Sequence, residues 1–357
     1  MGNLFGKAVK GKKDLFMSMQ TEFLIWDEQA TDQLSKYIRS GEVVAFPTET
    51  VYGLGADATN PEAVKKIFLA KGRPSDNPLI VHVASIEQIE SYVTEISPAA
   101  RRLIQAFMPG PLTVVLPSNG KISDQVTAGL DTVGVRIPDH PAAQELIQKA
   151  NVPIAAPSAN LSGKPSPTSA IHVFQDLNGK IKAILDGGTT GVGLESTVVD
   201  CTGEKPEIIR PGGVTQMEIE EVLGYPVELA TEDASEVQPK SPGMKYTHYQ
   251  PDVPLILIDG DQEFFQAQID EYRSNGEKVG VLASEELATI LNADLIHICG
   301  TVENLSTVAG QLYQSLRVFK KTEVDIILAE VFPTEGIGQA IMNRLNKAAN
   351  QIIKQEK

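Results

Sequence analysis

The stretch NPEAVKKIFLAKGRPSDNPLIVHVA, residues 60–84, decides the fold because a helix, a turn and a buried strand follow one another in it. Asn60 is expected to cap the helix, and Pro61 to stand in its first turn, where proline removes no hydrogen bond. The apolar run PLIVHVA (78–84) is typical of a strand bounded by turn residues. A helix that leads directly into a buried strand indicates an α/β domain.

The same alternation extends to both sides of this stretch. Helices are predicted for a segment opened by Asp32 and for the runs IEQIESYV and AARRLIQAF. Predicted strands outnumber these helices, so we expect a sizeable, mixed and twisted sheet. The predicted strands are FLIW (23–26), VVAFP (43–47), PLTVVLP, VGVRIP, PIAAPSA, AILDGG, STVVDC and EIIRP.

A second, smaller domain is predicted after a proline-rich segment. Residues 226–254 hold five prolines and several acids, a composition typical of a linker. Beyond it, LILID (255–259), KVGVLA (278–283), ADLIHIC (293–299) and VDIILAE (324–330) alternate with helix-like segments, which favours a small parallel, Rossmann-like sheet. The expected division is a disordered lead-in (1–21), the larger α/β domain (22–215), a linker (216–253) and the Rossmann-like α/β domain (254–350).

The composition excludes several classes of protein. Hydrophobic residues at 42% and charged residues at 22% are values of globular chains, not of mostly disordered ones. The formal charge of −15 argues against a clamp for nucleic acid, which depends on cationic side chains. No run is long and apolar enough to predict a membrane span, and two distant cysteines predict no disulfide framework. We therefore expect a cytoplasmic protein that binds no membrane.

Two glycine patterns imitate nucleotide-binding motifs. Gly53 to Ala58 fits the loose dinucleotide pattern, but Arg73 stands where a ribose-binding acid is expected. Gly2 to Lys7 lacks a spacer, the hydroxyl residue and the preceding strand of a P-loop. Neither pattern carries a function here, and no local motif for serine hydrolysis, zinc proteolysis or thiol redox chemistry is present.

Lys71 and Arg73 form a short cationic turn after the helix of residues 60–72. Glycine between them and proline after them make the turn stiff, a shape suited to polyphosphate. A solvated helix end is the alternative, because cations there also complement the helix dipole.

A second loop is rich in donors. Ser158 and Asn160 follow an apolar strand and lead into LSGKPSPTS, whose hydroxyl and backbone groups could bind an anion. An ordinary turn is the simpler explanation for such a composition.

Four further side chains stand within or at the ends of predicted apolar strands. Arg136 in a strand needs an anion, either an acidic residue of the chain or a substrate carboxylate, and Arg210 at the end of EIIRP poses the same question. His82, between two valines, is either a histidine of the core or a group that contacts a ligand. Glu195 is expected to be a simple strand cap. Such groups at the strand ends of one domain are what a site for a nucleotide and an amino acid requires.

The blocks that carry these residues resemble, in order, those of the YrdC-type L-threonylcarbamoyladenylate synthases. The paired signatures of that family, KxR and SxN, stand here as Lys71/Arg73 and Ser158/Asn160. SPGMKYTHYQP (241–251), followed by a small α/β domain, resembles the longer, two-domain members. The matching blocks are FPTETVYGLGADA (46–58), KGRPSDNPLIVHV (71–83), PGPLTVVL (109–116), VGVRIPDHP (133–141), APSANLSGKPSPTS (156–169), LESTVVD (194–200) and IIRPGG (208–213).

The resemblance implies a twisted mixed α/β sheet with a large concave cavity and a defined reaction. L-threonine, bicarbonate or CO2, and ATP give threonylcarbamoyl-AMP and pyrophosphate, for the threonylcarbamoyladenosine modification of tRNA. It implies Mg2+ bound with ATP, and a downstream tRNA threonylcarbamoyl-transferase that receives the product. Strong direct binding of tRNA is not expected, and residues 241–251 are the expected lid over the cavity.

The resemblance also implies roles for particular residues. Lys71 and Arg73 are the expected catalytic residues. Tyr249 in the linker is expected to help close the nucleotide site, with Tyr246 as the alternative. The remaining positions are, for the nucleotide, Arg73, Asn77, Thr132, Ser158, Asn160, Ser166 and Arg210, and, for L-threonine, Thr50, His82, Arg136, Ala156 and Ser196.

Two other functions compete with this one. An RNA-binding module would use the same cations as a basic concavity, against the acidic net charge of the chain. A carbamoyl-adenylate-forming enzyme would keep the enzyme class and change the acceptor, but that chemistry usually occurs in larger chains with zinc-finger cysteines, which this sequence lacks.

Overall fold

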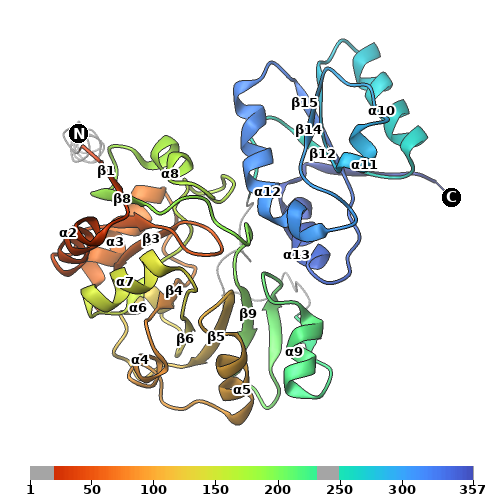
Figure 1. Ribbon diagram of the computed structural model, residues 1–357. Helices are drawn as coiled ribbons and strands as arrows, with labels where there is room; N and C mark the ends of the chain where they lie inside the picture. The colour runs from red at the N-terminus through yellow and green to blue at the C-terminus, as the bar shows by residue number, and fades with distance from the viewer. Residues whose placement is uncertain (1–19, 231–248, 357) are drawn as a thin grey trace, which may run out of the picture.

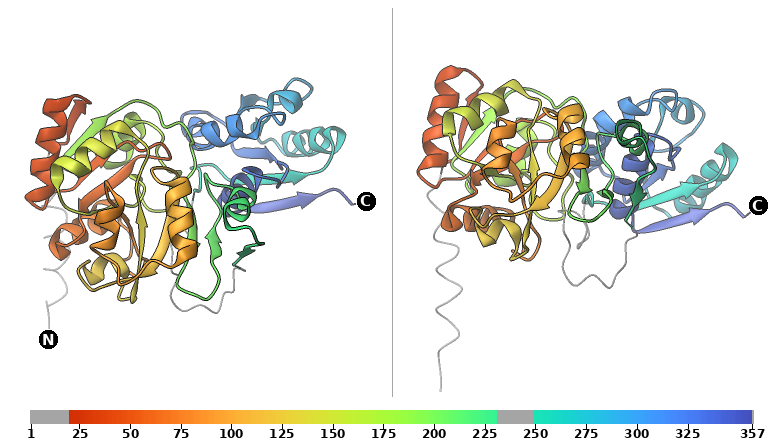
Figure 2. Two further views of the ribbon diagram at one scale, coloured as in Figure 1. Left: turned by 60° about the horizontal axis from the view of Figure 1, so that its bottom comes forward. Right: turned by 90° about the horizontal axis from the view of Figure 1, so that it is seen from below.

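The structure, a computed structural model, describes residues 20–230 and 249–356. The predicted lead-in therefore lies outside the described residues, except for its last two positions. Figure 1 shows two α/β bodies, each built around its own sheet, and the two views in Figure 2 keep these sheets side by side. The fold class predicted from the sequence is confirmed.

The larger sheet has eleven strands within residues 20–230, in the order β1-β8-β2-β3-β7-β4-β6-β5-β9-β10-β11. It is mixed, because parallel pairs such as β4–β6 and β5–β9 alternate with antiparallel pairs such as β5–β6 and β9–β10. The strands are β1 (Glu22–Ile25), β2 (Val44–Phe46), β3 (Gly53–Asp57), β4 (Ile80–His82), β5 (Leu112–Pro117), β6 (Thr132–Arg136), β7 (Ile154–Ala155), β8 (Ala183–Asp186), β9 (Thr197–Asp200), β10 (Glu207–Arg210) and β11 (Glu228–Leu229).

Helices cover both faces of this sheet, as the side chains of its strands show. In β2, Val44 and Phe46 pack in one apolar cluster with α2 and α7, while Ala45 between them packs in another with α3, α5 and α8. Alternate residues of a strand point to opposite faces, so these strands are buried on both sides. The helices are α2 (Glu28–Arg39), α3 (Pro61–Lys71), α4 (Ile86–Glu90), α5 (Pro98–Phe107), α6 (Asp124–Thr127), α7 (Pro141–Ala150), α8 (Ala170–Leu177) and α9 (Gln216–Leu223).

Three local predictions are settled by the structure. Asn60 caps α3 and Pro61 begins it, as predicted. The opening of α2 at Asp32 was wrong: Asp27 is the N-cap, since its Oδ1 accepts a hydrogen bond from the Ala30 amide at 2.7 Å, and Asp32 lies inside the helix. Gly53 to Asp57 forms strand β3, so these glycines make no phosphate-binding turn.

Residues 216–229, which the sequence analysis assigned to the linker, instead form α9 and β11. Thr215 and Glu218 make a reciprocal capping box at the start of α9, and β11 pairs with β10 in the larger sheet. The predicted lid over 241–251 lies mostly outside the described residues, which resume at Tyr249.

The smaller sheet, in residues 249–356, has five strands in the order β14-β13-β15-β12-β16, and all of its pairs are parallel. Strand β16 was not predicted, because it has only four residues and its two isoleucines are adjacent rather than alternating with polar residues. The elements are β12 (Leu255–Asp259), α10 (Gln262–Ser274), β13 (Val279–Ala283), α11 (Glu285–Ala288), β14 (Leu295–Ile298), α12 (Leu305–Val318), η1 (Phe319–Lys321), β15 (Ile326–Glu330), α13 (Gly338–Ala348) and β16 (Gln351–Lys354).

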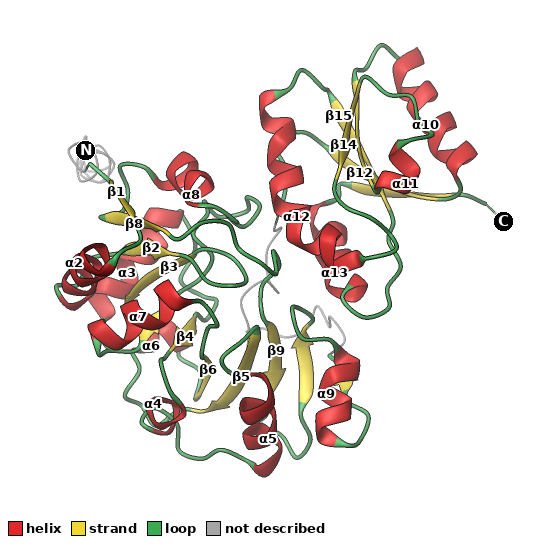
Figure 3. Cartoon of the chain, viewed as in Figure 1, coloured by secondary structure: helices red, strands yellow, loops and turns green. Residues whose placement is uncertain are grey.

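Helices α12 and α13 face the larger body, whereas α10 and α11 lie on the far side of the smaller sheet (Figure 3). Val51 and Leu194 of the larger body belong to the same apolar cluster as α12 and α13. At Gly193 the two backbones approach so closely that a Cβ atom would lie 2.4 Å from the carbonyl oxygen of Ala309. The two bodies are thus packed together beside the start of β9.

Candidate functional site

A cavity of about 730 Å³ opens where several strands of the larger sheet end. Its walls come from the β2–β3 loop, the end of α3, strands β4 and β6, the loop after β7 and the start of β9. Twelve of the fourteen site residues expected from the sequence line it: Thr50, Lys71, Arg73, His82, Arg136, Ala156, Ser158, Asn160, Ser166, Ser196, Arg210 and Tyr249.

Lys71 lies inside the protein rather than at a solvated helix end, with only 4% of its surface exposed. Its Nζ donates to the carbonyl oxygens of Ser158 (2.5 Å) and Asn160 (2.7 Å), so it ties α3 to the loop after β7. Gly72 turns the chain with a left-handed φ of +64°. Burial and the charge of Arg73 hold the pKa of Lys71 well below its usual value. A polyphosphate bound here would in turn favour the protonated form of Lys71, because little water is present to screen their attraction.

Arg73 extends along the edge of the same cavity, and its Nη2 donates to the carbonyl oxygen of Asn77 at 3.2 Å. Asn77 itself is buried, and Thr132 stands at the amino end of β6; neither lines the cavity. A hydrogen bond from Arg73 therefore connects Asn77 to the site, whereas Thr132 lies outside the cavity wall.

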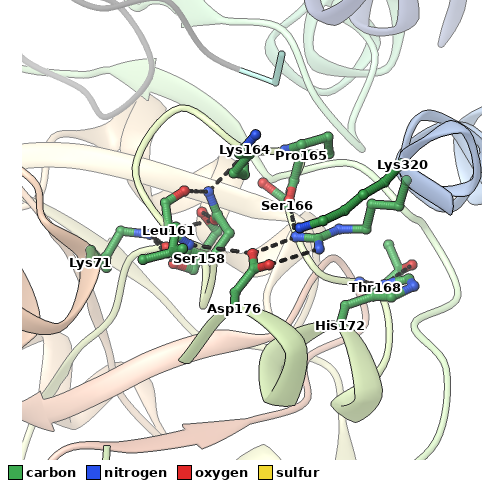
Figure 4. A network of polar contacts seen from close by, with 12 residues as sticks. Lys71, Ser158, Leu161, Lys164, Pro165, Ser166, Thr168, His172, Asp176 and Lys320 are labelled. Carbon is green, nitrogen blue, oxygen red and sulfur yellow. Dashed lines mark hydrogen bonds and ion pairs between the residues drawn. The ribbon is translucent and has the colours of Figure 1, made fainter. Parts of the chain in front are cut away.

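The loop after β7 is held by its own polar side chains. The Ser158 hydroxyl donates to Asn160 Oδ1 at 2.5 Å, and the amide nitrogen of Asn160 donates to the carbonyl oxygens of Leu161 and Lys164, both at 2.8 Å. Figure 4 shows this loop beside Asp176 of α8. These side-chain hydrogen bonds hold the loop in one conformation, which an ordinary turn does not need.

Arg136 has the acidic partner that the sequence left open. Its Nη2 lies 2.6 Å from Glu49 Oε1, its Nη1 donates to Thr50 Oγ1 at 2.9 Å, and its Nε donates to the carbonyl oxygen of Gly110 at 3.2 Å. A buried guanidinium paired in this way avoids the cost of an isolated charge. It also lines the cavity, so a substrate carboxylate could reach it.

His82 lies beside Arg136 in the neighbouring strand and is nearly fully buried. Burial, reinforced by the charge of Arg136, lowers the pKa of His82 to about 3. Nδ1 lies 3.3 Å from the carbonyl oxygen of Ile80. His82 is therefore a neutral imidazole at pH 7, able to contact a ligand in the cavity without adding a charge.

Ser196 and Arg210 join β9 to β10 at the cavity wall. Arg210 Nη2 donates to the carbonyl oxygen of Ser196 at 2.8 Å and to its hydroxyl at 3.1 Å. The Ser196 hydroxyl also lies 2.8 Å from that of Thr113. Burial and the nearby charge of Arg344 lower the pKa of Arg210.

Tyr249 lines the cavity from the C-terminal side of the segment that is not described. Its φ of +65° is left-handed, which costs a non-glycine residue about 1–2 kcal/mol. Its ring stacks on Tyr313 of α12, with the centroids 5.3 Å apart. Tyr246, the alternative named from the sequence, lies outside the described residues.

Glu195 was expected to be a simple strand cap, and its place in the site was not predicted from the sequence. The Glu195 carboxylate lines the cavity and accepts hydrogen bonds from Ser166, Tyr313 and Arg344. An acid directly after the apolar Leu194 and directly before the predicted strand STVVDC was the available signal for a buried carboxylate. Nothing local marked Tyr313 or Arg344, more than a hundred residues away.

Within residues 20–230 and 249–356, no group of three or more histidine, cysteine, aspartate or glutamate side chains could hold a metal ion. Over the same described residues, no helix is long and apolar enough to cross a membrane.

Comparisons with known proteins agree with this geometry. Residues 36–212 match the Sua5, YciO and YrdC family model, described as "Telomere recombination", and residues 214–350 match the model "Threonylcarbamoyl-AMP synthase, C-terminal domain". The threonylcarbamoyl-AMP synthase of Bacillus subtilis (strain 168) is 52% identical over 339 residues, which cover 94% of this chain and 97% of that protein. The chain belongs to the threonylcarbamoyl-AMP synthase family.

Other members of the threonylcarbamoyl-AMP synthase family extend the similarity to three dimensions. The enzyme of Pyrococcus abyssi (strain GE5 / Orsay) is 48% identical over 324 residues, covering 89% of this chain and 94% of that protein. The crystal structure of Pyrococcus abyssi Sua5 complexed with L-threonine matches with a TM-score of 0.88 at 45% identity, over 94% of this chain and 99% of that one. The family resemblance seen in the sequence is thus confirmed along nearly the whole chain.

Proposed function

We propose that this chain joins L-threonine, bicarbonate or CO2, and ATP into threonylcarbamoyl-AMP and pyrophosphate, for the threonylcarbamoyladenosine modification of tRNA. One observation carries the proposal: a single cavity is lined by Arg136, whose guanidinium suits a carboxylate, and by Lys71 and Arg73, whose charges suit a polyphosphate. A free amino acid and a nucleoside triphosphate can therefore bind side by side.

The reaction needs no nucleophile from the protein. The amine of threonine captures CO2 to form a carbamate, and a carbamate oxygen attacks the α-phosphorus of ATP while pyrophosphate leaves. The protein contributes by holding the two reactants in line and by stabilising charge that develops on the phosphate. This division of labour agrees with a cavity lined by fixed donors such as Lys71, Ser158 and Arg136.

Roles follow from the position of each side chain. Arg136 and Thr50 lie together at the threonine end, where His82, Ala156 and Ser196 complete the proposed pocket. Lys71 and Arg73 are the proposed catalytic residues at the phosphate end. The other proposed nucleotide-binding residues are Asn77, Thr132, Ser158, Asn160, Ser166, Arg210 and Tyr249.

Mg2+ is proposed to arrive with ATP rather than to be held by protein ligands. Of the acids in and beside the cavity, Glu49 lies 2.6 Å from Arg136 and Glu195 lies 2.9 Å from Arg344, so neither offers a free carboxylate. Mg2+ commonly keeps several waters and binds through substrate phosphates, where it neutralises their charge. The protein residues around it would act on the phosphates, not on the ion.

The RNA-binding alternative is weakened by burial. Lys71, Arg136 and Arg210 are each at most 5% exposed and donate to groups inside the protein. A nucleic-acid backbone is bound by exposed cations that release counterions. We propose that the product passes to a separate tRNA threonylcarbamoyl-transferase in the cytoplasm, without strong binding of tRNA by this chain.

Pyrophosphate release from ATP and bicarbonate tests the proposed function. We expect release that depends on L-threonine and falls about 5- to 150-fold in kcat/KM with serine, since one methyl group is worth roughly 1–3 kcal/mol. Release that is independent of threonine would contradict the proposal. Release that requires a carbamoyl donor instead would favour the carbamoyl-adenylate alternative.

A further inference from the structure

The carboxylate of Glu195 accepts hydrogen bonds from both bodies of the protein. Its Oε1 accepts a hydrogen bond from the Ser166 hydroxyl at 2.6 Å. Its Oε2 accepts one from the Tyr313 hydroxyl at 2.7 Å and one from Arg344 Nε at 2.9 Å. Ser166 belongs to the loop that lines the nucleotide end of the cavity, whereas Tyr313 lies on α12 and Arg344 on α13.

The partners from the C-terminal domain are themselves enclosed. Arg344 has no exposed surface, and its Nη1 also donates to the carbonyl oxygen of Pro211 at 2.9 Å. Its guanidinium carbon lies 5.7 Å from the centre of the Tyr249 ring, which stacks on Tyr313. A buried arginine is costly unless it is paired, so α13 docks with this charge only where Glu195 receives it.

The charge of Glu195 matters because this carboxylate lines the cavity proposed for ATP. Burial alone would raise its pKa, but the charges of Arg344 and Arg210 and the hydrogen bond from Ser166 outweigh burial and lower the pKa to about 2. Glu195 is therefore ionised at pH 7. A polyphosphate next to an unpaired buried carboxylate would be repelled strongly.

We propose that the C-terminal domain completes the nucleotide site: Arg344 and Tyr313 are positioning residues that neutralise Glu195 and, through it, orient Ser166. This inference rests on the proposed function, since it assumes that the cavity admits a triphosphate. It assigns the domain a direct part in substrate binding, in addition to any covering of the cavity.

Replacing Arg344 tests the charge balance. In Arg344→Gln, Glu195 faces the cavity without its nearest cation, and we expect the Kd of a non-hydrolysable probe, α,β-methylene-ATP, to rise about tenfold or more. Adding Glu195→Gln removes the uncompensated charge, so the double variant should recover most of that affinity. Arg344→Lys keeps the charge and should stay within about threefold of the unsubstituted chain.

Arg317 offers a matched control on the same interface. It lies on α12 and forms an ion pair with Asp176 of the larger body, with Nη2 2.8 Å from Asp176 Oδ2, but it does not contact Glu195. Arg317→Gln also removes a cation from the contact between the two bodies. Any weakening of probe binding in Arg317→Gln should not be rescued by Glu195→Gln.

The pH dependence of binding gives a second readout. The groups that face Glu195 are Arg344, Arg210, Tyr313, Tyr249 and Ser166, and in Arg344→Gln burial should raise the pKa of Glu195. Glu195 then takes up a proton as the pH falls from 8 to about 5.5, and the binding defect should narrow. The unsubstituted chain should show no such recovery, because its Glu195 stays ionised and paired.

The outcomes separate this inference from the proposed function. An unchanged probe Kd in Arg344→Gln, or a double variant that binds as poorly as the single one, would overturn the inference while leaving the proposed function intact. Absence of threonine-dependent pyrophosphate release from the unsubstituted chain would overturn the proposed function. If Arg344→Gln does not fold, Tyr313→Phe replaces it, with an expected two- to fivefold rise in Kd and no pH-dependent recovery.

Discussion

Replacing Gly193 by alanine should push the two bodies of the protein apart. Gly193 has a left-handed φ of +79°, and a Cβ atom there would lie 2.4 Å from the carbonyl oxygen of Ala309 and 2.5 Å from the Cα of Gly310. Both neighbours are backbone atoms of α12, which cannot rotate away as a side chain would. An ordinary contact needs about 3.4 Å, so α12 must retreat by roughly 1 Å.

The size of the effect follows from two contributions. An alanine held at a left-handed φ costs about 1–2 kcal/mol. Retreat of α12 also stretches the 2.7 Å hydrogen bond from Tyr313 to Glu195, and losing a hydrogen bond to a charged group costs roughly 1.5–3 kcal/mol. We expect Gly193→Ala to lower the free energy of unfolding by about 2.5–5 kcal/mol, and pyrophosphate release to fall roughly tenfold or more.

Gly191 supplies the matched control two residues away. A Cβ atom at Gly191 would meet no heavy atom within 4 Å, and its φ lies outside the left-handed region, so Gly191→Ala should change little. Urea unfolding gives the change in stability, and pyrophosphate release at saturating ATP and threonine gives the change in turnover. If Gly193→Ala and Gly191→Ala behave alike, the close approach of α12 has no part in stability or activity, and this reasoning is refuted.

Two further predictions concern the cavity itself. Arg73→Ala should abolish pyrophosphate release and change the thermal midpoint far less, because Arg73 lines the cavity and donates to the loop carbonyls of Asn77 and Pro78 at 3.2 and 3.5 Å. Turnover like that of the unsubstituted chain would remove Arg73 from the mechanism. His82→Gln should alter the pH dependence of stability. Burial lowers the pKa of His82 from 6.5 to about 3, so the unfolded chain binds the proton first and the stabilising contribution of neutral His82 is lost as pH falls below 6.5. Urea unfolding measures the difference in free energy of unfolding between the unsubstituted chain and His82→Gln. This difference should shrink by up to about 2 kcal/mol between pH 6.5 and pH 5. A difference that does not change with pH would mean that His82 titrates at its usual pKa.

The charges of the cavity share one physical feature, which the individual motifs did not reveal. Arg136 is paired with Glu49 and Arg344 with Glu195, so these two cations enter the interior together with an acid of the same chain. Removing one partner of such a pair leaves an uncompensated buried charge, which costs about 3–5 kcal/mol. The site is thus preorganised before any substrate binds, and substrates with carboxylate or phosphate groups must fit into existing networks.

Local sequence was sufficient for the fold class, and together with the family resemblance it predicted most of the cavity wall. The alternation of short apolar strands with capped helices predicted a mixed sheet, and Lys71, Arg73, Ser158 and Asn160 stood out because strand ends and turns expose their chemistry within a few residues. The start of α2 was misplaced by about one turn, because Asp27 and Asp32 are equally good caps in the sequence and only the hydrogen bond from Ala30 distinguishes them.

Sequence by itself determined which side chains carry positive charge and hydroxyl groups at the ends of the strands, since those properties belong to residue types and local spacing. Tertiary structure alone decided which acid neutralises each cation. Arg344 lies 149 positions from Glu195 in the sequence. Its sequence surroundings are those of any arginine on an amphipathic helix. Only the packing of α13 against the larger body buries both groups and pairs them. That pairing depends on packing between distant segments, which no local pattern encodes.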